Sequence, residues 1–191
     1  HGKVIFDILH LTGEEEIIFV DDNESIHDFV NKKVIKSINV DSKFPILISI
    51  GNNFIRKKIS ENLSNSFFNA IHLSANISEF TQMGKGNAIM AGAAINIDSK
   101  IGDHCIINTN ASIDHDCIIE DFVHISPNAT LAGNVQVGEG TWIGAGATII
   151  QGTKIGKWVT IGAGSVVLND IPDFAVVVGV PAKIIKYNDK K

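Results

Sequence analysis

The sequence predicts a small α/β domain at the N-terminus, followed by a long run of short strands joined by tight corners. Two observations carry this prediction. In the first seventy residues, apolar segments with strand-like and helix-like patterns alternate. From Ile77 to Val167, every sixth residue is aliphatic or methionine without a break. A period of six fits neither a helix nor an isolated amphipathic strand, but it is typical of repeat architectures whose units stack on one another.

The N-terminal domain is expected to contain two helices and three strands. The apolar spacing of KVIFDILHL (3–11) predicts a helix, and FIRKKISENL (54–63) is expected to form the second. Buried strands are expected at EIIFVDDN (16–23), FPILISIGNN (44–53) and FFNAIH (67–72). Ligands of parallel α/β sheets bind at the carboxyl ends of the strands. The residues expected along that rim are His1, Gly2, Asp21, Asp22, Gly51 and Asn52.

Each repeat combines its aliphatic residue with a small or β-branched residue four positions later, with Asn87 as the exception. The large residue is expected to fill the interior of a strand and the small one a narrow corner, where Gly and Asn accept positive φ. Cys105 and Cys117 occupy the small position. They are therefore expected to be free thiols in the core, not a disulfide or zinc ligands.

The composition and charge of the chain limit the classes of partner that the protein can bind. The 191 residues carry a formal net charge of −5, which argues against a nucleic-acid partner. No apolar run is long enough to span a bilayer and no signal-peptide pattern opens the chain, so we expect no membrane partner and a cytoplasmic location. No Lys or Arg occurs between Lys100 and Lys154, whereas six acidic residues do. This asymmetry indicates either two ligands of opposite charge or an ordinary solvated surface.

One segment of the repeat is rich in polar and ionisable side chains. SIDHDCIIEDFVHIS (112–126) contains two histidines and four acidic residues, and His115 stands between Asp114 and Asp116. An imidazole titrates near neutral pH and suits a general base, and a neighbouring carboxylate can orient the ring and stabilise the imidazolium. The alternative is a surface histidine at a corner of the repeat.

The unbroken repeat over roughly residues 75–170 resembles the left-handed parallel β-helix of the hexapeptide-repeat acyltransferases, in which three hexads make one turn. The opening His-Gly-Lys, the strand that ends in Asp-Asp and the lack of an inserted loop extend the resemblance to nearly the whole chain. These features resemble the sialic-acid O-acetyltransferase-like sugar acetyltransferases. Among those, they are closest to bacterial UDP-4-amino-sugar N-acetyltransferases of the bacillosamine-pathway type.

The resemblance implies a division of the chain. A Rossmann-like domain that binds a nucleotide sugar is expected at 1–73, and a left-handed β-helix acetyltransferase domain at 74–172. A C-terminal tail near CoA is expected at 173–191. The glycine-rich loop of the family precedes His-Gly-Lys, so it would lie upstream of His1.

The resemblance also assigns roles to residues. His115 would be the general base and Asp116 would orient it. The residues expected to bind the sugar substrate are His1, Asp21, Asp22 and Asn108, and those expected to bind acetyl-CoA are His124, Gly133, Ala145, Gly162, Ala163 and Lys183. The backbone N–H of Gly133 or Ala145 would hold the thioester oxygen, and Lys183 and Lys186 would face the CoA phosphates. No metal is expected, because the histidine spacing does not match the γ-class carbonic anhydrases.

The expected activity is acetyl-CoA-dependent N-acetylation of the 4-amino group of a nucleotide-linked amino-deoxy sugar. Acetyl-CoA is the co-substrate, and the transfer is expected to be direct, in a ternary complex, because no nucleophile suited to a covalent intermediate stands out. The enzyme is expected to be a homotrimer with active sites between neighbouring β-helices. Two alternatives stay open: an O-acetyltransferase acting on sialic acid or another hydroxyl acceptor, and a non-catalytic assembly protein.

Overall fold

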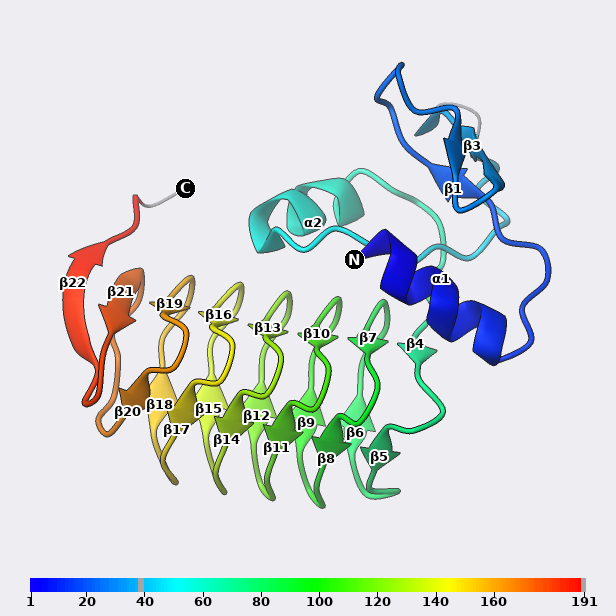
Figure 1. The fold of residues 1–191 in the computed structure, drawn as a ribbon. Helices are drawn as coiled ribbons and strands as arrows, with labels where there is room; N and C mark the ends of the chain where they lie inside the picture. Colours follow the sequence, from blue (N-terminus) through cyan, green and yellow to red (C-terminus); the bar gives the residue numbers. More distant parts are fainter. Residues whose placement is uncertain (38–39, 190–191) are drawn as a thin grey trace.

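Strands of two residues recur every six residues from Ala70 to Val167, and those up to β17 (Thr148–Ile149) each pair in parallel with the strand eighteen residues further on. This register builds three sheets around one axis, the left-handed parallel β-helix that the sequence predicted (Figure 1). The computed structural model describes residues 1–37 and 40–189.

The three sheets are named here in chain order. Sheet I contains β4 (Ala70–Ile71), β7 (Ala88–Ile89), β10 (Ile106–Ile107), β13 (His124–Ile125), β16 (Trp142–Ile143), β19 (Thr160–Ile161), β21 (Ala175–Val178) and β22 (Lys183–Tyr187). Sheet II contains β5 (Asn76–Ile77), β8 (Ala94–Ile95), β11 (Ser112–Ile113), β14 (Thr130–Leu131), β17 (Thr148–Ile149) and β20 (Val166–Val167). Sheet III contains β6 (Gln82–Met83), β9 (Lys100–Ile101), β12 (Ile118–Ile119), β15 (Gln136–Val137) and β18 (Lys154–Ile155). The turns between them are the I–II, II–III and III–I corners.

The core follows the six-residue pattern directly. The second residue of each strand faces the axis, so the side chains of Ile107, Ile113 and Leu131 are completely buried. The small residues of the pattern fill the corners, and Cys105 and Cys117 lie there as buried free thiols, as predicted. Burial raises the pKa of Cys105 to about 12, which leaves its thiol protonated and unreactive at neutral pH.

The corners hold a left-handed residue every eighteen positions. At the I–II and II–III corners these residues are Gly, Asn or Asp, which tolerate positive φ. The III–I corner has Gly86 and Gly140 at two of these positions, but the others carry His104, Phe122, Trp158 and Phe174 with φ between 56° and 62°. Bulky side chains rarely adopt this conformation, so their presence indicates that the III–I corner has been adapted to another task.

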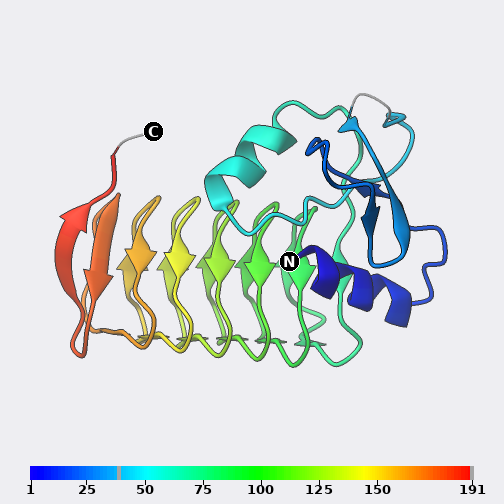
Figure 2. The ribbon, with the colours of Figure 1, turned by 45° about the horizontal axis from the view of Figure 1, so that its top comes forward.

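That task is to hold the second helix. α2 (Asn53–Ser60) lies along the III–I corner, where Phe54 meets the edge of Trp158 with ring centroids 6.2 Å apart. The Asn53 amide donates to the carbonyls of Gly140 (3.0 Å) and Thr141 (3.2 Å). Figures 1 and 2 show both helices on the sheet I side of the β-helix.

The two predicted helices are confirmed, with small shifts in their bounds. α1 (Gly2–Leu11) packs Ile5 and Ile8 against the first strands of sheet I, including Ala70 and Ile106. α2 begins at Asn53 because the side chain of Asn52 accepts a hydrogen bond from the N–H of Ile55 (3.0 Å) and caps the helix. In the part of the chain that the structure describes, no helix is long and apolar enough to cross a membrane.

The predicted strands of the N-terminal domain need correction. β1 is shorter than expected (Phe19–Val20) and pairs in parallel with β3 (Lys32–Ile35), which forms a hairpin with β2 (Asp28–Phe29). The strand expected at 44–53 is wrong: only Ile46 forms a bridge, to Phe67. The carbonyls of Ile50 and Gly51 bind a side chain of α2 instead of another strand.

The segment at 67–72 does contain a strand, but not one of the N-terminal sheet. β4 pairs with β7, so Ala70 and Ile71 already belong to sheet I. At the other end, β21 extends sheet I beside β19, and β22 returns antiparallel to β21 as the edge of that sheet. Strands therefore occur in the region expected to be a tail.

Candidate active site

His115 lies at the II–III corner, between β11 and β12, with 56% of its side chain exposed. Its Nδ1 is 2.8 Å from Oδ2 of Asp116. Because Nδ1–H is donated to this carboxylate, the lone pair of Nε2 lies on the side of the ring away from Asp116. It has no hydrogen-bond partner among the described residues. The hydrogen bond to Asp116, reinforced by the charge of Asp114, raises the pKa of His115 above its usual value. The pair has the form of a general base with its orienting acid.

The carboxylate of Asp114 holds the backbone at His115 in place. Oδ1 of Asp114 accepts hydrogen bonds from the backbone N–H of His115 (2.8 Å) and from the side-chain amide of Asn96 (2.9 Å). These two bonds hold the pKa of Asp114 below its usual range, so the carboxylate stays charged. Asn96 was missed in the sequence analysis, although it precedes Asp114 by eighteen residues and so lies one turn away in the same column.

Gly133 lies beside His115 on the next turn. A Cβ at Gly133 would stand 2.6 Å from the imidazole ring, so only glycine leaves the ring in this position. The sequence placed Gly133 in the same column as His115, and the structure brings the two together. The space next to Gly133 is occupied by the imidazole.

A second cluster lies around His124, on strand β13 of sheet I, next to the I–II corner. Oδ1 of Asn108 accepts the N–H of Thr109 (2.8 Å), which leaves the Asn108 amide nitrogen to donate to Nε2 of His124 (3.1 Å). His124 therefore carries its proton on Nδ1, which has no hydrogen-bond partner among the described residues. Burial first, and then the charge of Arg56, lower the pKa of His124 to about 4. It is a neutral ring at physiological pH.

Two further aromatic rings flank His124. The His1 ring meets its edge at 5.2 Å, and Trp142 stacks almost parallel to it at 5.9 Å. The Trp142 indole is oriented by its N–H, which donates to Oγ of Ser126 (2.7 Å), while 51% of the residue stays exposed. Sequence reasoning missed Trp142, although it is an aromatic residue at an outward-facing position of a repeat rich in small residues.

The two clusters do not meet within one chain. His115, Asp116 and Gly133 lie at the II–III corner, whereas Asn108 lies at the I–II corner and His124 on the adjoining strand β13 of sheet I. The whole width of sheet II separates them. Each corner carries only part of the predicted site.

The remaining predicted residues are placed as follows. Ala145 and Ala163 are exposed at the I–II corner, one turn apart, on the C-terminal side of His124. A Cβ at Gly162 would lie 2.7 Å from Val178, so this glycine permits the packing of β21. Lys183 is exposed at the start of β22.

Asp21 and Asp22 follow β1 and make local hydrogen bonds. Asp21 Oδ1 accepts the N–H of Asn23 (2.8 Å), and Asp22 accepts the N–H of Ser37 (2.9 Å) and its hydroxyl (2.8 Å). The bonds from Ser37 lower the pKa of Asp22. Both side chains thus stabilise the loops that follow β1 and β3.

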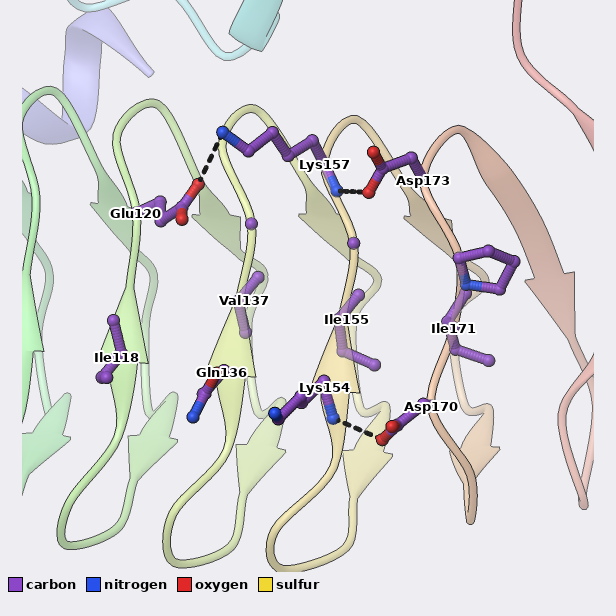
Figure 3. A pocket seen from close by; sticks show the side chains of 13 residues that line it. Ile118, Glu120, Gln136, Val137, Lys154, Ile155, Lys157, Asp170, Ile171 and Asp173 are labelled. Carbon is purple, nitrogen blue, oxygen red and sulfur yellow. Dashed lines mark hydrogen bonds and ion pairs between the residues drawn. The ribbon is translucent and has the colours of Figure 1, made fainter.

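A groove of about 500 Å³ lies on sheet III (Figure 3). Its acids are already engaged: Asp170 and Asp173 accept the backbone N–H groups of Lys154 and Lys157, each at 2.8 Å. The ammonium of Lys157 pairs with Glu120 at 3.4 Å. The three acidic residues of the groove outnumber its two lysines by one, and it contains none of the predicted site residues. Within residues 1–37 and 40–189, no group of three or more His, Cys, Asp or Glu is arranged to hold a metal ion.

The buried histidines predict how stability depends on pH. Burial lowers the pKa of both His104 and His124, so the unfolded chain binds more protons than the folded one below about pH 6.5. Their stabilisation is complete above that pH and is lost as the pH falls, for His124 down to about 4. We expect His124 alone to cost on the order of 2–3 kcal/mol of unfolding free energy across this window.

Urea unfolding between about pH 7.5 and 5 measures this effect, because the carboxylates remain charged there. The comparison is best made in a His115→Ala background, since the raised pKa of His115 acts in the opposite direction. His124→Gln should flatten the pH dependence, and replacing the exposed His27 should not. An unchanged slope in His124→Gln would contradict the burial argument.

Comparison with known proteins gives a consistent result. Residues 1–63 match the family of the PglD N-terminal domain. Residues 98–133 and 134–169 match the six-repeat family of bacterial transferase hexapeptides. None of the curated protein sequences matches significantly.

Solved structures match over the whole described fold. A mutant of perosamine N-acetyltransferase from Caulobacter crescentus, in complex with CoA and GDP-perosamine, is 37% identical with a TM-score of 0.90, covering 97% of this chain and 92% of that one. The acetyltransferase domain of PglB from Neisseria gonorrhoeae, in complex with acetyl coenzyme A, is 39% identical with a TM-score of 0.92, covering 97% and 94%. WeeI from Acinetobacter baumannii is 25% identical with a TM-score of 0.90, covering 96% and 94%.

Proposed function

Because the chain belongs to the hexapeptide-repeat sugar acetyltransferases of the bacillosamine-pathway type, and is therefore an acetyltransferase that uses acetyl-CoA, we propose that it N-acetylates a nucleotide-linked 4-amino sugar with His115 as the general base. Structures similar to this chain are described with CoA and GDP-perosamine, a nucleotide-linked sugar, and with acetyl coenzyme A. The 4-amino position and the direct transfer are parts of the proposal.

The observation that carries the proposal is the His115–Asp116 pair, with Nδ1 bound at 2.8 Å and Nε2 free. The amine nitrogen attacks the thioester carbonyl carbon while Nε2 of His115 takes the amine proton. The carbon–sulfur bond then breaks, the acetyl group stays on nitrogen, and the CoA thiolate leaves and takes up a proton. Asp116 stabilises the imidazolium formed in between.

The developing negative charge on the thioester oxygen needs a hydrogen-bond donor. The sequence left Gly133 and Ala145 as candidates, and within the described residues neither N–H donates a hydrogen bond. Gly133 is the one that lies against His115 in the same chain. Its N–H is therefore our preferred donor, and the exposed amides of Ala145 and Ala163 are proposed to bind the pantetheine arm.

The two separate corner clusters support a homotrimer. Sheet II lies between them, and its outward residues are small: Ala94, Ser112, Thr130 and Thr148. In a closed ring of three parallel β-helices, sheet II can approach its neighbours closely. The II–III corner of one copy then faces the I–II corner of the next, which brings His115 to Asn108 and His124. We propose that each active site is completed in this way.

Lys183 and Lys186 are proposed to face the CoA phosphates. Both lie on β22, past the last turn, where the basic residues follow the acidic middle of the chain. Neutralising both to Gln should raise the Kd for CoA by about 3- to 30-fold, because exposed charge pairs each contribute little. The effect should shrink with added salt. Isothermal titration calorimetry at two salt concentrations measures this change in the Kd for CoA.

The matched control for the lysine pair is Lys100→Gln, which removes an exposed lysine of sheet III. CoA affinity should not change in this variant. Dephospho-CoA should lose less affinity than CoA in the double variant, since it lacks the 3′-phosphate. Equal losses for the two ligands would contradict contact with that phosphate.

The proposed function is tested by release of free CoA thiol in the presence of acetyl-CoA and different acceptors. Nucleotide-linked 4-amino sugars should be acetylated on nitrogen, as detected by mass spectrometry of the product. Turnover with sialic acid or other hydroxyl acceptors, and none with amino sugars, would favour an O-acetyltransferase. Absence of turnover with both kinds of acceptor would favour an assembly protein.

A further inference from the structure

Arg56 of α2 is completely buried, and all of its hydrogen bonds go to neutral oxygens. Nε donates to the carbonyl of His104 at 2.8 Å. Nη1 donates to the carbonyls of Ile50 (2.9 Å) and Gly51 (3.4 Å). Nη2 donates to Oδ1 of Asn53 and to the carbonyl of Phe122, both at 2.9 Å. The five N–H groups of the guanidinium thus have five acceptors.

No carboxylate neutralises this charge in the part of the chain that the structure describes, where Arg56 takes part in no ion pair. Burial lowers the pKa of Arg56 to about 10, so the side chain stays charged at neutral pH. A buried, unpaired cation is costly, and an apolar side chain of similar size would join two surfaces at lower cost. The arginine is therefore better explained by the geometry of its acceptors than by packing.

Those acceptors belong to three separate segments. His104 and Phe122 lie on successive turns of the III–I corner, Asn53 lies on α2, and Ile50 and Gly51 lie on the loop before α2. That loop supports His1: a Cβ at Gly51 would stand 2.5 Å from the His1 ring. The His1 ring in turn meets His124 at 5.2 Å. A rigid path therefore runs from the β-helix through Arg56 to the residues above His124.

We propose that Arg56 is a positioning residue for the acceptor sugar: it fixes the loop at Ile50 and Gly51, and with it His1, at a set height above His124. The proposal rests on the proposed function and on the role that the family resemblance implies for His1, which is to bind the nucleotide sugar. None of the five hydrogen bonds of Arg56 goes to Ala145, Ala163 or Lys183, which are proposed to bind acetyl-CoA. The other acetyl-CoA candidate near it, His124, is not hydrogen-bonded to Arg56, so losing the arginine should affect the sugar much more than acetyl-CoA.

The test compares Arg56→Met with Lys57→Met. Methionine at 56 keeps much of the volume and removes all five hydrogen bonds. Lys57 also joins α2 to the β-helix, through its ion pair with Glu139 and its place over the rings of Phe122 and Trp158, but it contacts neither the loop nor His1. Lys57→Met is thus a matched control for weaker docking of α2. Both variants should be checked for folding by circular dichroism and melting temperature.

In Arg56→Met, the KM for the nucleotide sugar should rise at least about 10-fold, as for the loss of one charge-assisted hydrogen bond, while the KM for acetyl-CoA stays within about twofold. Arg56→Lys keeps the charge and up to three donors, and it should recover part of the loss. Lys57→Met should lower the melting temperature and leave both KM values unchanged. Equal changes in both KM values, or the same sugar defect in Lys57→Met, would overturn the proposal and leave Arg56 as a docking residue alone.

A second readout needs no substrate. The charge of Arg56 helps to lower the pKa of His124, so His124 should titrate at a higher pH in Arg56→Met, as followed by NMR of the free protein. In Arg56→Lys and Lys57→Met the titration should stay close to that of the wild type. If the wild type acetylates no amino sugar, the proposed function fails while this titration can still succeed. An unchanged His124 titration in a folded Arg56→Met would contradict the placement of the Arg56 charge beside His124, on which the proposal depends.

Discussion

Replacing His115 with alanine is expected to lower kcat by about 10²- to 10⁴-fold, the range for loss of a general base. The affinities for both substrates should change little, because the imidazole acts on the proton that is transferred in the transition state. Asp116→Ala should cost less, since the ring remains and loses only the 2.8 Å bond that orients it. Steady-state kinetics with both substrates varied measure these effects.

The pH profile gives the same residue a second signature. The imidazole must be neutral to accept the amine proton, so kcat/KM should rise with pH as the imidazolium of His115 loses its proton. Because Asp116 and Asp114 raise the pKa of His115, this rise should be centred above the ordinary histidine value of about 6.5. In Asp116→Ala the midpoint should move down, and in His115→Ala this part of the profile should disappear.

His27→Ala is the matched control, because His27 is exposed and lies outside both clusters. It should leave the rate and its pH dependence unchanged. Near-normal turnover by His115→Ala would mean that another group is the base. His124 would then be tested, although its Nε2 already accepts a bond from Asn108 and its pKa of about 4 makes it a weak base.

Mixed trimers of two inactive variants are expected to regain activity. One variant, His115→Ala, keeps the I–II corner intact, and the other, Asn108→Ala, keeps the II–III corner intact. If the active site lies between two copies, one of the three interfaces in every trimer that contains both variants combines two intact corners. Co-expression with two different affinity tags isolates these mixed trimers, whose activity should approach about one third of the wild-type value.

The control for complementation is His115→Ala mixed with the double variant His115→Ala/Asn108→Ala, which offers no intact II–III corner. It should stay inactive. Mixed trimers of the two single variants that also stay inactive would show that the site is not shared in the proposed way. Sedimentation equilibrium provides the underlying check, since a stable monomer at micromolar concentration would exclude any shared site.

The sequence alone determined the β-helix, because the six-residue pattern is local and recurs in every repeat. The aliphatic residue of each repeat was predicted to fill the interior, and the side chains of Ile107, Ile113 and Leu131 are indeed completely buried there. The eighteen-residue turn also follows from the repeat, and it is enough to place Gly133 in one column with His115. The His115–Asp116 pair was equally readable, since its members are adjacent in the chain.

Only the tertiary structure decided how the N-terminal domain meets the β-helix. The segments at 44–53 and 67–72 read as strands of one sheet, yet β4 joins sheet I and the carbonyls of Ile50 and Gly51 bind Arg56. The partition of the site between two corners, and the place of Trp142 beside His124, were equally hidden. These features depend on hydrogen bonds and ring contacts between residues far apart in the chain, often to backbone carbonyls, and a backbone carbonyl is present at every residue. The pattern of side chains therefore cannot reveal which carbonyl a buried arginine will bind.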